Sequence, residues 1–393
     1  MKILGKIKIL YQNFKGLSVM GGATLITNGL GALFWFYMAS AMGADAYGQV
    51  SYFIAIAIIG SRISLLGLGN TMMVYTAKGV KIQPPIYLIA IIGSIITSLI
   101  LFFVFLYDVG ISLYVIGFVV FTLIISDLLG RKQYKSYAKC LISQKIILII
   151  LAVSLYHVIG LTGVILGIAI SFLPYSFVIY NEFKKSKIDF SLIRSRGKFI
   201  TNNYVNDLTH TFNGQVDKLI VAPMLGFALL GNYQLAIQFF MILTILPTTV
   251  FQYILPHDAS GNANLGLKKW LVITAVLFAI LGIIIFPIIS TVFFPEYEES
   301  IPVIQIISIA IIPFTITTIY NSKFLGLGNS KIVLVGSLIF LGVLIPLIII
   351  LGDIFMLEGV GLAMVLGYTG QSIYLTLSDK FLKSGNKLNQ NSN

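Results

Sequence analysis

The sequence has 393 residues, of which 58% are hydrophobic and only 10% charged, with a mean hydropathy of +0.96. Soluble domains usually carry about 25% charged residues, so a chain this apolar cannot cover a surface that faces water. Composition therefore excludes a soluble enzyme or binding protein and predicts an all-α integral membrane protein. The net charge of +12 would indicate nucleic acid for a soluble protein. Here its distribution predicts membrane orientation, and no nucleic-acid partner is expected.

Apolar runs that are long enough to cross a bilayer, which takes about 20 residues, recur twelve times along the chain. We expect the spans at 17–42, 47–77, 86–107, 111–134, 141–157, 161–181, 200–226, 231–255, 270–294, 300–322, 331–351 and 358–379. The first run follows a basic amino end, but it exceeds the roughly 7–15 residues of a signal-peptide core. It is therefore expected to be the first span.

The distribution of lysine and arginine supports this count. With the amino terminus placed inside, every basic residue except Arg62 and Lys218 falls in the amino end, in an inner loop or in the carboxyl tail. The outer loops hold acids instead, namely Asp45, Asp108, Glu296, Glu298, Glu299, Asp353 and Glu358. This is the positive-inside pattern. It predicts a multi-pass protein of the cell (cytoplasmic) membrane with both termini in the cytoplasm.

Two short matches predict an internal repeat of six plus six spans. The stretch 42–48 after span one recurs in outline as 225–231 after span seven, and 161–164 at the start of span six recurs as 357–360 at the start of span twelve. Because six is even, the repeats are parallel. We expect a six-helix bundle over 1–181, a basic cytoplasmic linker over 182–199, a second six-helix bundle over 200–380 and a cytoplasmic tail over 381–393.

Polar side chains within the predicted spans cluster on a few helices. Charged groups inside a membrane are costly and usually face a cavity or a partner. Span seven carries a polar stripe that covers about 100° of one helix face, formed by Asn203, Asp207, His210, Gly214, Asp217 and Lys218. Spans one, two and eight add Thr24, Asn28, Arg62, Gln234, Gln238, Thr248 and Gln252. We expect a water-filled cavity between the halves, lined by these four spans.

The polar residues of these four spans predict two kinds of role. The substrate-binding candidates are Arg62, Asn28, Thr24, Lys218, Gln234 and Gln238. The cations could attract an anionic headgroup, and the amides and hydroxyls could bind sugar hydroxyls. Asp207, Asp217 and His210 are candidates for ion coupling, because a histidine titrates near neutral pH. The structural alternative is that Asp217 neutralises Lys218 or Arg62 in an ion pair that only holds the bundle together.

Four stretches give the chain a family resemblance. They are MGADAYG at 42–48, DKLI at 217–220 with LGNYQLA at 230–236, FPEY at 294–297, and FLGLGNSK at 324–331 with EGVGLA at 358–363. With these motifs the chain resembles the oligosaccharide-lipid flippases of the polysaccharide biosynthesis (Wzx-type) family. That family belongs to the multidrug/oligosaccharidyl-lipid/polysaccharide exporter superfamily.

The resemblance implies a V-shaped fold of twelve helices in two six-helix bundles that works by alternating access. Its implied substrate is a glycan on a polyprenyl phosphate or diphosphate, moved from the inner to the outer leaflet. The chain departs from the family at Ala39 and Ser40, where an arginine is frequent, and it lacks the two extra helices of the peptidoglycan-precursor flippases. Few cations fall in the expected cavity, so the anion-binding role rests largely on Arg62.

Three functions fit these features to different degrees. The first is the lipid-linked glycan flippase, with membrane lipids and glycan-pathway membrane proteins as further partners. The second is an ion-coupled multidrug or small-molecule exporter of the same superfamily, which Asp207 and Asp217 favour. The third is a membrane-embedded transferase, which would need general acid–base groups on an accessible loop. The loops provide few such groups, and the sequence has no Walker-type motif or metal-ligand cluster, so we expect no enzyme, cofactor or metal.

Overall fold

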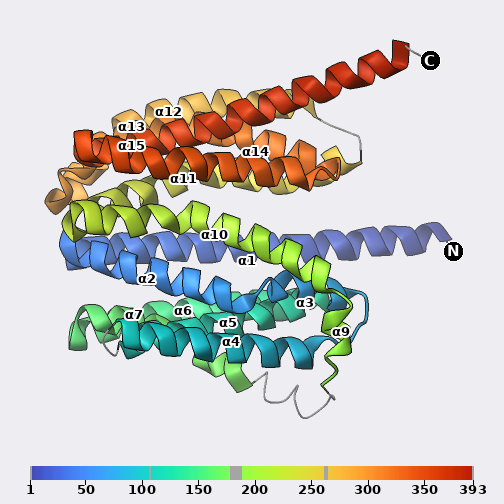
Figure 1. The fold of residues 1–393 in the computed structure, drawn as a ribbon, viewed down its shortest axis with the longest axis horizontal. Helices are drawn as coiled ribbons and strands as arrows, with labels where there is room; N and C mark the ends of the chain where they lie inside the picture. Colours follow the sequence, from blue (N-terminus) through green and yellow to red (C-terminus); the bar gives the residue numbers. More distant parts are fainter. Residues whose placement is uncertain (1, 106–107, 178–187, 261–263, 392–393) are drawn as a thin grey trace. The chain divides into compact units, whose positions relative to one another are not determined.

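The computed structural model describes residues 2–105, 108–177, 188–260 and 264–391. Within these ranges the chain forms helices and short turns and no strand (Figure 1). The backbone of a membrane-embedded chain must satisfy its own hydrogen bonds, which an α-helix does within one segment. The predicted all-α fold is confirmed.

The helices follow one another with short connections. The first half contains α1 (Lys2–Met42), α2 (Ala44–Leu65), α3 (Leu68–Ala77), α4 (Gln83–Val104), α5 (Val109–Gly130), α6 (Tyr134–Ile159), α7 (Leu161–Ile170), the 3₁₀ turn η1 (Leu173–Tyr175) and α9 (Ser191–Arg194). The second half contains α10 (Gly197–Leu225), α11 (Phe227–Ala259), α12 (Leu265–Phe293), the turn η2 (Pro295–Tyr297), α13 (Ser300–Ile309), α14 (Ile311–Gly326) and α15 (Ser330–Asn391).

The helices account for the predicted number of spans. In the part of the chain that the structure describes, nine helical stretches are long and apolar enough to cross a membrane. One of them, Ser330–Leu382, contains a break at Met356 and therefore supplies two spans. The shorter apolar stretch Leu161–Tyr175 and the polar, 29-residue α10 supply two more. The predicted twelve-span architecture is confirmed.

Several predicted spans differ from the helices in detail. The span at 47–77 is not one helix but two, α2 and α3, and the span at 300–322 divides into α13 and α14 at Ala310. Helix α1 begins at Lys2 rather than at 17, and the end of the span predicted at 161–181 falls outside the described residues. Hydropathy measures how apolar a segment is. A helix break depends on the backbone dihedral angles, which hydropathy does not report.

The chain divides into two compact units. Unit 1 contains Met1–Met38 and Phe53–Thr211, and unit 2 contains Ala39–Tyr52 and Phe212–Asn393. The short segment Ala39–Tyr52 thus packs with the second part of the chain. The repeat boundaries at 181 and 200 describe a different division and stay a prediction.

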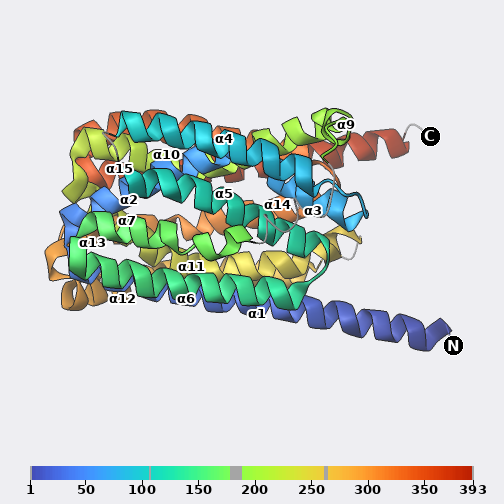
Figure 2. The ribbon, with the colours of Figure 1, turned by 90° about the horizontal axis from the view of Figure 1, so that it is seen from below.

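Unit 1 is organised around α5. This helix packs on α3, α4 and α7, and α7 packs on α6. In Figure 2, α5 and α7 lie between α4 and α6. Phe172 fills the centre of this packing, with its ring 5.8 Å from Tyr114 and 5.5 Å from Phe121. These contacts hold the end of α7 against α5.

Helices α11 to α15 form most of unit 2. Helix α11 packs on α13 and α14, α12 packs on α13, and α14 packs on α15. Phe324 of α14 forms a buried cluster with Val333 and Leu375 of α15. A buried ion pair adds to this packing, because Lys268 donates to both carboxylate oxygens of Asp258 at 2.6 and 2.8 Å.

The two matched sequence stretches that open spans six and twelve have the same local geometry. Gly160 has φ 70° and ψ −143°, and Met356, its counterpart, has φ 49° and ψ −128°. Three residues later, a Cβ on Gly163 or Gly359 would overlap the backbone of the residue eight positions earlier in the chain. Each glycine therefore allows two antiparallel helices to touch backbone to backbone, which agrees with an internal repeat.

Candidate functional site

An interruption between α2 and α3 divides the second span of unit 1. Leu66 has φ 50° and Gly67 has φ 72°, and both lie between the end of α2 and the start of α3. A Cβ on Gly67 would lie 2.5 Å from the backbone nitrogen of Tyr204 and 2.7 Å from the carbonyl oxygen of Ile200 on α10. Only glycine fits here, and the break therefore lies directly against the backbone of α10.

Arg62 lies in the last turn of α2, four residues before the break. Its side chain is half-buried, and its guanidinium carbon lies 5.2 Å from the centre of the Phe118 ring on α5. A guanidinium over an aromatic ring is stabilised by the ring quadrupole without losing its charge. Among the described residues, no carboxylate forms an ion pair with Arg62. The packing thus holds an arginine in place without a direct ion-pair partner in the described part of the chain.

Asp207 of α10 contacts α3, the helix that follows the break. Its Oδ1 accepts a hydrogen bond of 3.0 Å from Asn70 in the first turn of α3. Arg62 and His210 both act electrostatically on this carboxylate. Asp207 is half-buried, whereas His210 and Asn70 are exposed. The structure therefore brings two predicted candidates, Arg62 and Asp207, to the same interrupted span.

The candidates on α1 lie near Lys145 of α6. Thr24 is half-buried and donates to the carbonyl of Met20 at 3.0 Å, and Asn28 is exposed. One turn further, a Cβ on Gly31 would lie 3.5 Å from the Nζ of Lys145. The positive-inside pattern places Lys145 among the inner basic residues, but in the structure it lies three turns inside α6. Its position inside a predicted span was the available signal.

Asp217 and Lys218 form a buried network in unit 2. Their side chains are 3.3 Å apart, and the two residues are 7% and 6% exposed. Lys218 also donates to the carbonyl of Gly214 at 2.9 Å, and the Tyr233 hydroxyl donates to the other Asp217 oxygen at 2.9 Å. These contacts agree with the alternative in which Asp217 neutralises Lys218 and the pair only holds the helices together.

The glutamines of α11 are also buried within unit 2. Gln238 interacts with the Tyr47 hydroxyl. Gln234 has a carbonyl oxygen without a hydrogen-bond partner among the described residues. Thr248 and Gln252, further along the same helix, are exposed. In the described ranges, no group of three or more His, Cys, Asp or Glu residues could hold a metal ion.

Comparisons with known proteins address the fold. No protein-family model matches the chain, and no curated protein matches its sequence. Several solved structures do match. An inward-facing multidrug resistance MATE family transporter of the MOP superfamily has a TM-score of 0.73 at 12% identity, covering 92% of this chain and 95% of that chain. The lipid II flippase MurJ, in an inward closed conformation, has a TM-score of 0.70 at 17% identity, covering 92% of this chain and 87% of that chain.

A MATE transporter of Vibrio cholerae matches as well, with a TM-score of 0.60 at 14% identity over 96% of this chain and 98% of that chain. At identities this low, structural similarity shows a shared fold and nothing about the activity or substrate. The expected fold is confirmed, whereas membership of the exporter superfamily and of the Wzx-type family within it stays a prediction. The chain therefore has the fold that the MATE proteins and MurJ share.

Proposed function

We propose that the chain is a flippase that moves a polyprenyl-(di)phosphate-linked oligosaccharide from the inner to the outer leaflet of the cell membrane. It works by alternating access and serves surface polysaccharide assembly. The observation that carries this proposal is the break at Leu66–Gly67 with the charged residues Arg62 and Asp207 beside it. The fold supports it, because a solved neighbour is described as a lipid II flippase.

The break is a departure from the repeat. Span two corresponds to span eight, and α11 runs through the latter as one helix of 33 residues, Phe227–Ala259. Interrupted helices in transporters usually lie at binding sites, since unwound backbone groups become available to a ligand. They are tolerated at membrane depth only where protein or a water-filled cavity surrounds them. The break at Leu66–Gly67, with charged side chains beside it, therefore supports a functional role for span two.

The cations of unit 1 suit a phosphate-bearing headgroup. Arg62 and Lys145 are both half-buried, and neither forms an ion pair with a described carboxylate. Keeping an unpaired cation inside a membrane protein is costly, so such residues usually mark a substrate or ion pathway. We assign Arg62 and Lys145 to the phosphate, and Thr24, Asn28 and Asn70 to sugar hydroxyls.

The candidates of unit 2 divide by their contacts. Gln234 has an unpartnered oxygen, so it and Gln238 stay in the proposed sugar-binding set. Lys218 has two acceptors already, Gly214 and Asp217. We therefore propose that Asp217 and Lys218 support the packing of α10 against α11 and α15 rather than binding substrate.

A second function has an observation in its favour. Asp207 is a half-buried carboxylate that accepts a hydrogen bond from Asn70 and lies in the field of His210. A carboxylate in this position could bind an organic cation or a coupling proton. Several of the solved neighbours are MATE transporters, and some of these are described as multidrug resistance proteins. The alternative is an ion-coupled exporter of small cations.

A reconstituted transport assay separates the two functions. Purified full-length protein in liposomes is given either a fluorescent polyprenyl-diphosphate-linked oligosaccharide or ethidium. We expect flipping of the lipid and no ethidium transport. Arg62→Gln and Lys145→Gln should each slow flipping about ten-fold or more, because each removes a charge-assisted hydrogen bond. The matched control is Arg194→Gln, which removes an exposed arginine of α9 outside the spans.

Two results would contradict the proposal in different ways. A full flipping rate in Arg62→Gln, at wild-type protein yield and melting temperature, would remove Arg62 from the substrate site. Ethidium transport without lipid flipping, abolished by Asp207→Asn, would establish the exporter instead.

A further inference from the structure

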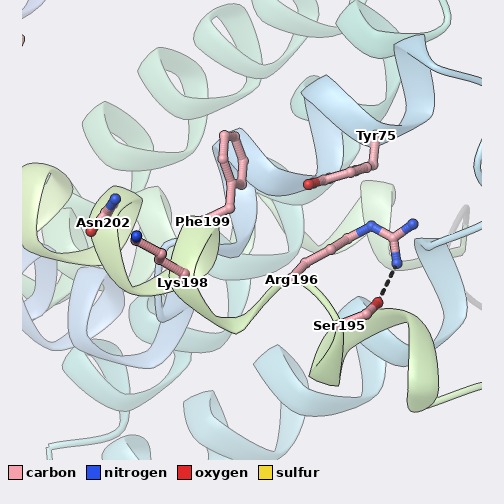
Figure 3. A pocket seen from close by; sticks show the side chains of 6 residues that line it. All are labelled: Tyr75, Ser195, Arg196, Lys198, Phe199 and Asn202. Atoms are coloured by element: carbon pink, nitrogen blue, oxygen red, sulfur yellow. Dashed lines mark hydrogen bonds between the residues drawn. The ribbon is translucent and has the colours of Figure 1, made fainter.

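A basic pocket lies in unit 1 where α3 ends and α10 begins (Figure 3). It has a volume of about 340 Å³ and is lined by Tyr75, Ser195, Arg196, Lys198, Phe199 and Asn202. Pockets of roughly 300 Å³ or more are large enough to hold a small ligand or headgroup. Tyr75 lies in α3, two turns past the break at Leu66–Gly67, and the other lining residues belong neither to the interrupted span nor to the α1 candidates described above.

The arginine of this pocket is fixed in one orientation. The guanidinium carbon of Arg196 lies 4.5 Å from the centre of the Tyr75 ring, and Phe199 meets the same ring edge-on at 5.5 Å. Nη1 of Arg196 donates to the carbonyl of Leu192 at 2.5 Å and to Ser195 Oγ at 3.0 Å. Figure 3 shows Arg196 extended between Tyr75 and Ser195. The remaining donors of the guanidinium need little reorganisation to bind an anion.

One donor of Arg196 is unsatisfied. Its Nε is buried and has no hydrogen-bond partner among the described residues. A buried N–H group without an acceptor costs about 1–3 kcal/mol, so a site of this kind usually has an acceptor in its working state. The missing partner is a hydrogen-bond acceptor, and beside a guanidinium an anionic oxygen is the strongest one.

The described carboxylates do not neutralise the charge of the pocket. The ammonium group of Lys78 lies 5.2 Å from the Tyr75 ring centre, and Lys198 lines the pocket wall. In the described part of the chain, no carboxylate pairs with Arg196, Lys198 or Lys78. Other basic residues near helix ends do have such partners, namely Arg131 with Asp127, Lys268 with Asp258 and Lys323 with Asp379.

The start of α10 adds to this positive field. The first intrahelical bond runs from Ile200 to the carbonyl of Arg196 at 3.0 Å, so the amide groups of the first turn have no acceptor within the helix. The helix dipole favours an anion at this end. The side-chain cations and the backbone of α10 thus attract the same kind of ligand.

The surroundings of the pocket point to the membrane surface. The positive-inside pattern predicts that the end of α3 and the start of α10 lie on the cytoplasmic side. Aromatic side chains such as Tyr75 and Phe199 are typical of the boundary between lipid tails and headgroups. Basic pockets between membrane helices on this side can bind the headgroups of anionic lipids. We propose that this pocket binds the phosphate group of an anionic membrane lipid of the inner leaflet.

Native mass spectrometry of the purified full-length protein tests the proposal. The probes are phosphatidylglycerol, phosphatidylcholine and inorganic pyrophosphate. We expect phosphatidylglycerol to bind about ten-fold more tightly than phosphatidylcholine. Lys198→Gln should weaken its binding about five-fold, and Arg196→Gln about ten-fold or more. The control Arg194→Gln removes the same charge two residues away but outside the pocket, and should change binding less than about two-fold.

Each contrary outcome is distinct. Equal binding of the two phospholipids, or an equal loss in all three variants, would mean that the pocket has no specific phosphate site. Tight binding of pyrophosphate without lipid preference would replace the lipid by a soluble phosphate ligand. Lys198 is exposed and has no hydrogen bond or ion pair among the described contacts, so its variant is informative even if Arg196→Gln fails to fold. Binding is read without transport, so this test stands apart from that of the flippase.

Discussion

Gly48 of α2 and Gly231 of α11 lie backbone to backbone within unit 2. A Cβ on Gly48 would lie 2.8 Å from the Gly231 nitrogen and would overlap the carbonyl of Phe227, and a Cβ on Gly231 would overlap the carbonyl of Ala44. These glycines are the last residues of the two matching stretches, 42–48 and 225–231. Each stretch begins its helix after a glycine with positive φ, 75° at Gly43 and 91° at Gly226. The repeated motif is therefore both a turn and a close contact between its two copies.

Alanine at either glycine should destabilise the protein. Gly48→Ala and Gly231→Ala each place a methyl group on a carbonyl that belongs to a helix backbone and cannot rotate away. Overpacking of this kind costs about 1–3 kcal/mol or more. We expect a lower melting temperature of the purified protein and a lower yield. Gly29→Ala is the control, because a Cβ there meets nothing within 4 Å. An unchanged melting temperature in Gly48→Ala would refute the close contact.

The break between α2 and α3 can be tested with two glycines of similar backbone conformation. Gly67 has φ 72° and packs against α10, whereas Gly79 has φ 76° and open space around it. Gly79→Ala should lose only the left-handed backbone preference, about 1–2 kcal/mol. Gly67→Ala should lose this and displace α10, so both stability and transport should fall further. The comparison of melting temperature and flipping rate isolates the contact. Equal losses in the two variants would show that α10 does not need the glycine.

Met356 is a non-glycine residue where its counterpart in the other repeat is glycine. Its φ of 49° with ψ of −128° is a conformation that glycine adopts readily and other residues do not. Met356→Gly should therefore stabilise the turn by about 1 kcal/mol. Gly160→Ala should destabilise the matching turn by a similar amount, although a Cβ there meets nothing within 4 Å. Thermal unfolding of both variants measures this. A loss of stability in Met356→Gly would show that its half-exposed side chain matters more than its backbone.

The buried pair of Asp217 and Lys218 predicts a double-mutant effect. Removing one partner of a buried ion pair leaves an uncompensated charge and costs about 3–5 kcal/mol. Asp217→Asn and Lys218→Met should each lower the melting temperature, and the double variant should recover much of the loss. The Tyr233 hydrogen bond to Asp217 makes Asp217→Asn the milder change. Wild-type stability in Asp217→Asn, combined with lost transport, would instead return Asp217 to the ion-coupling candidates.

Much of the candidate site could be predicted from the sequence because membrane burial makes polar residues conspicuous. Arg62 and Asp207 are polar residues in apolar runs, and both lie beside the same interruption. The stripe on α10 was predicted as one lining, yet Asp207 interacts with Asn70 of unit 1 and Asp217 with Tyr233 of unit 2. The spacing of a helix shows which residues share a face but not what that face meets.

The sequence alone predicted that lipid surrounds most of the chain, how many spans the chain has and that it contains a repeat. Each of these follows from local composition or spacing. Apolar runs indicate the segments buried in lipid, basic residues indicate the inner loops, and glycines at matching positions of the two halves indicate the turns. Only the tertiary structure showed that Gly67 interrupts a span against α10, that Lys145 lies beside Gly31, and that Arg196 stacks on Tyr75. These relationships depend on side chains and backbone from helices far apart in the chain. No pattern within a single segment encodes its neighbour, which is chosen by the packing of the whole unit.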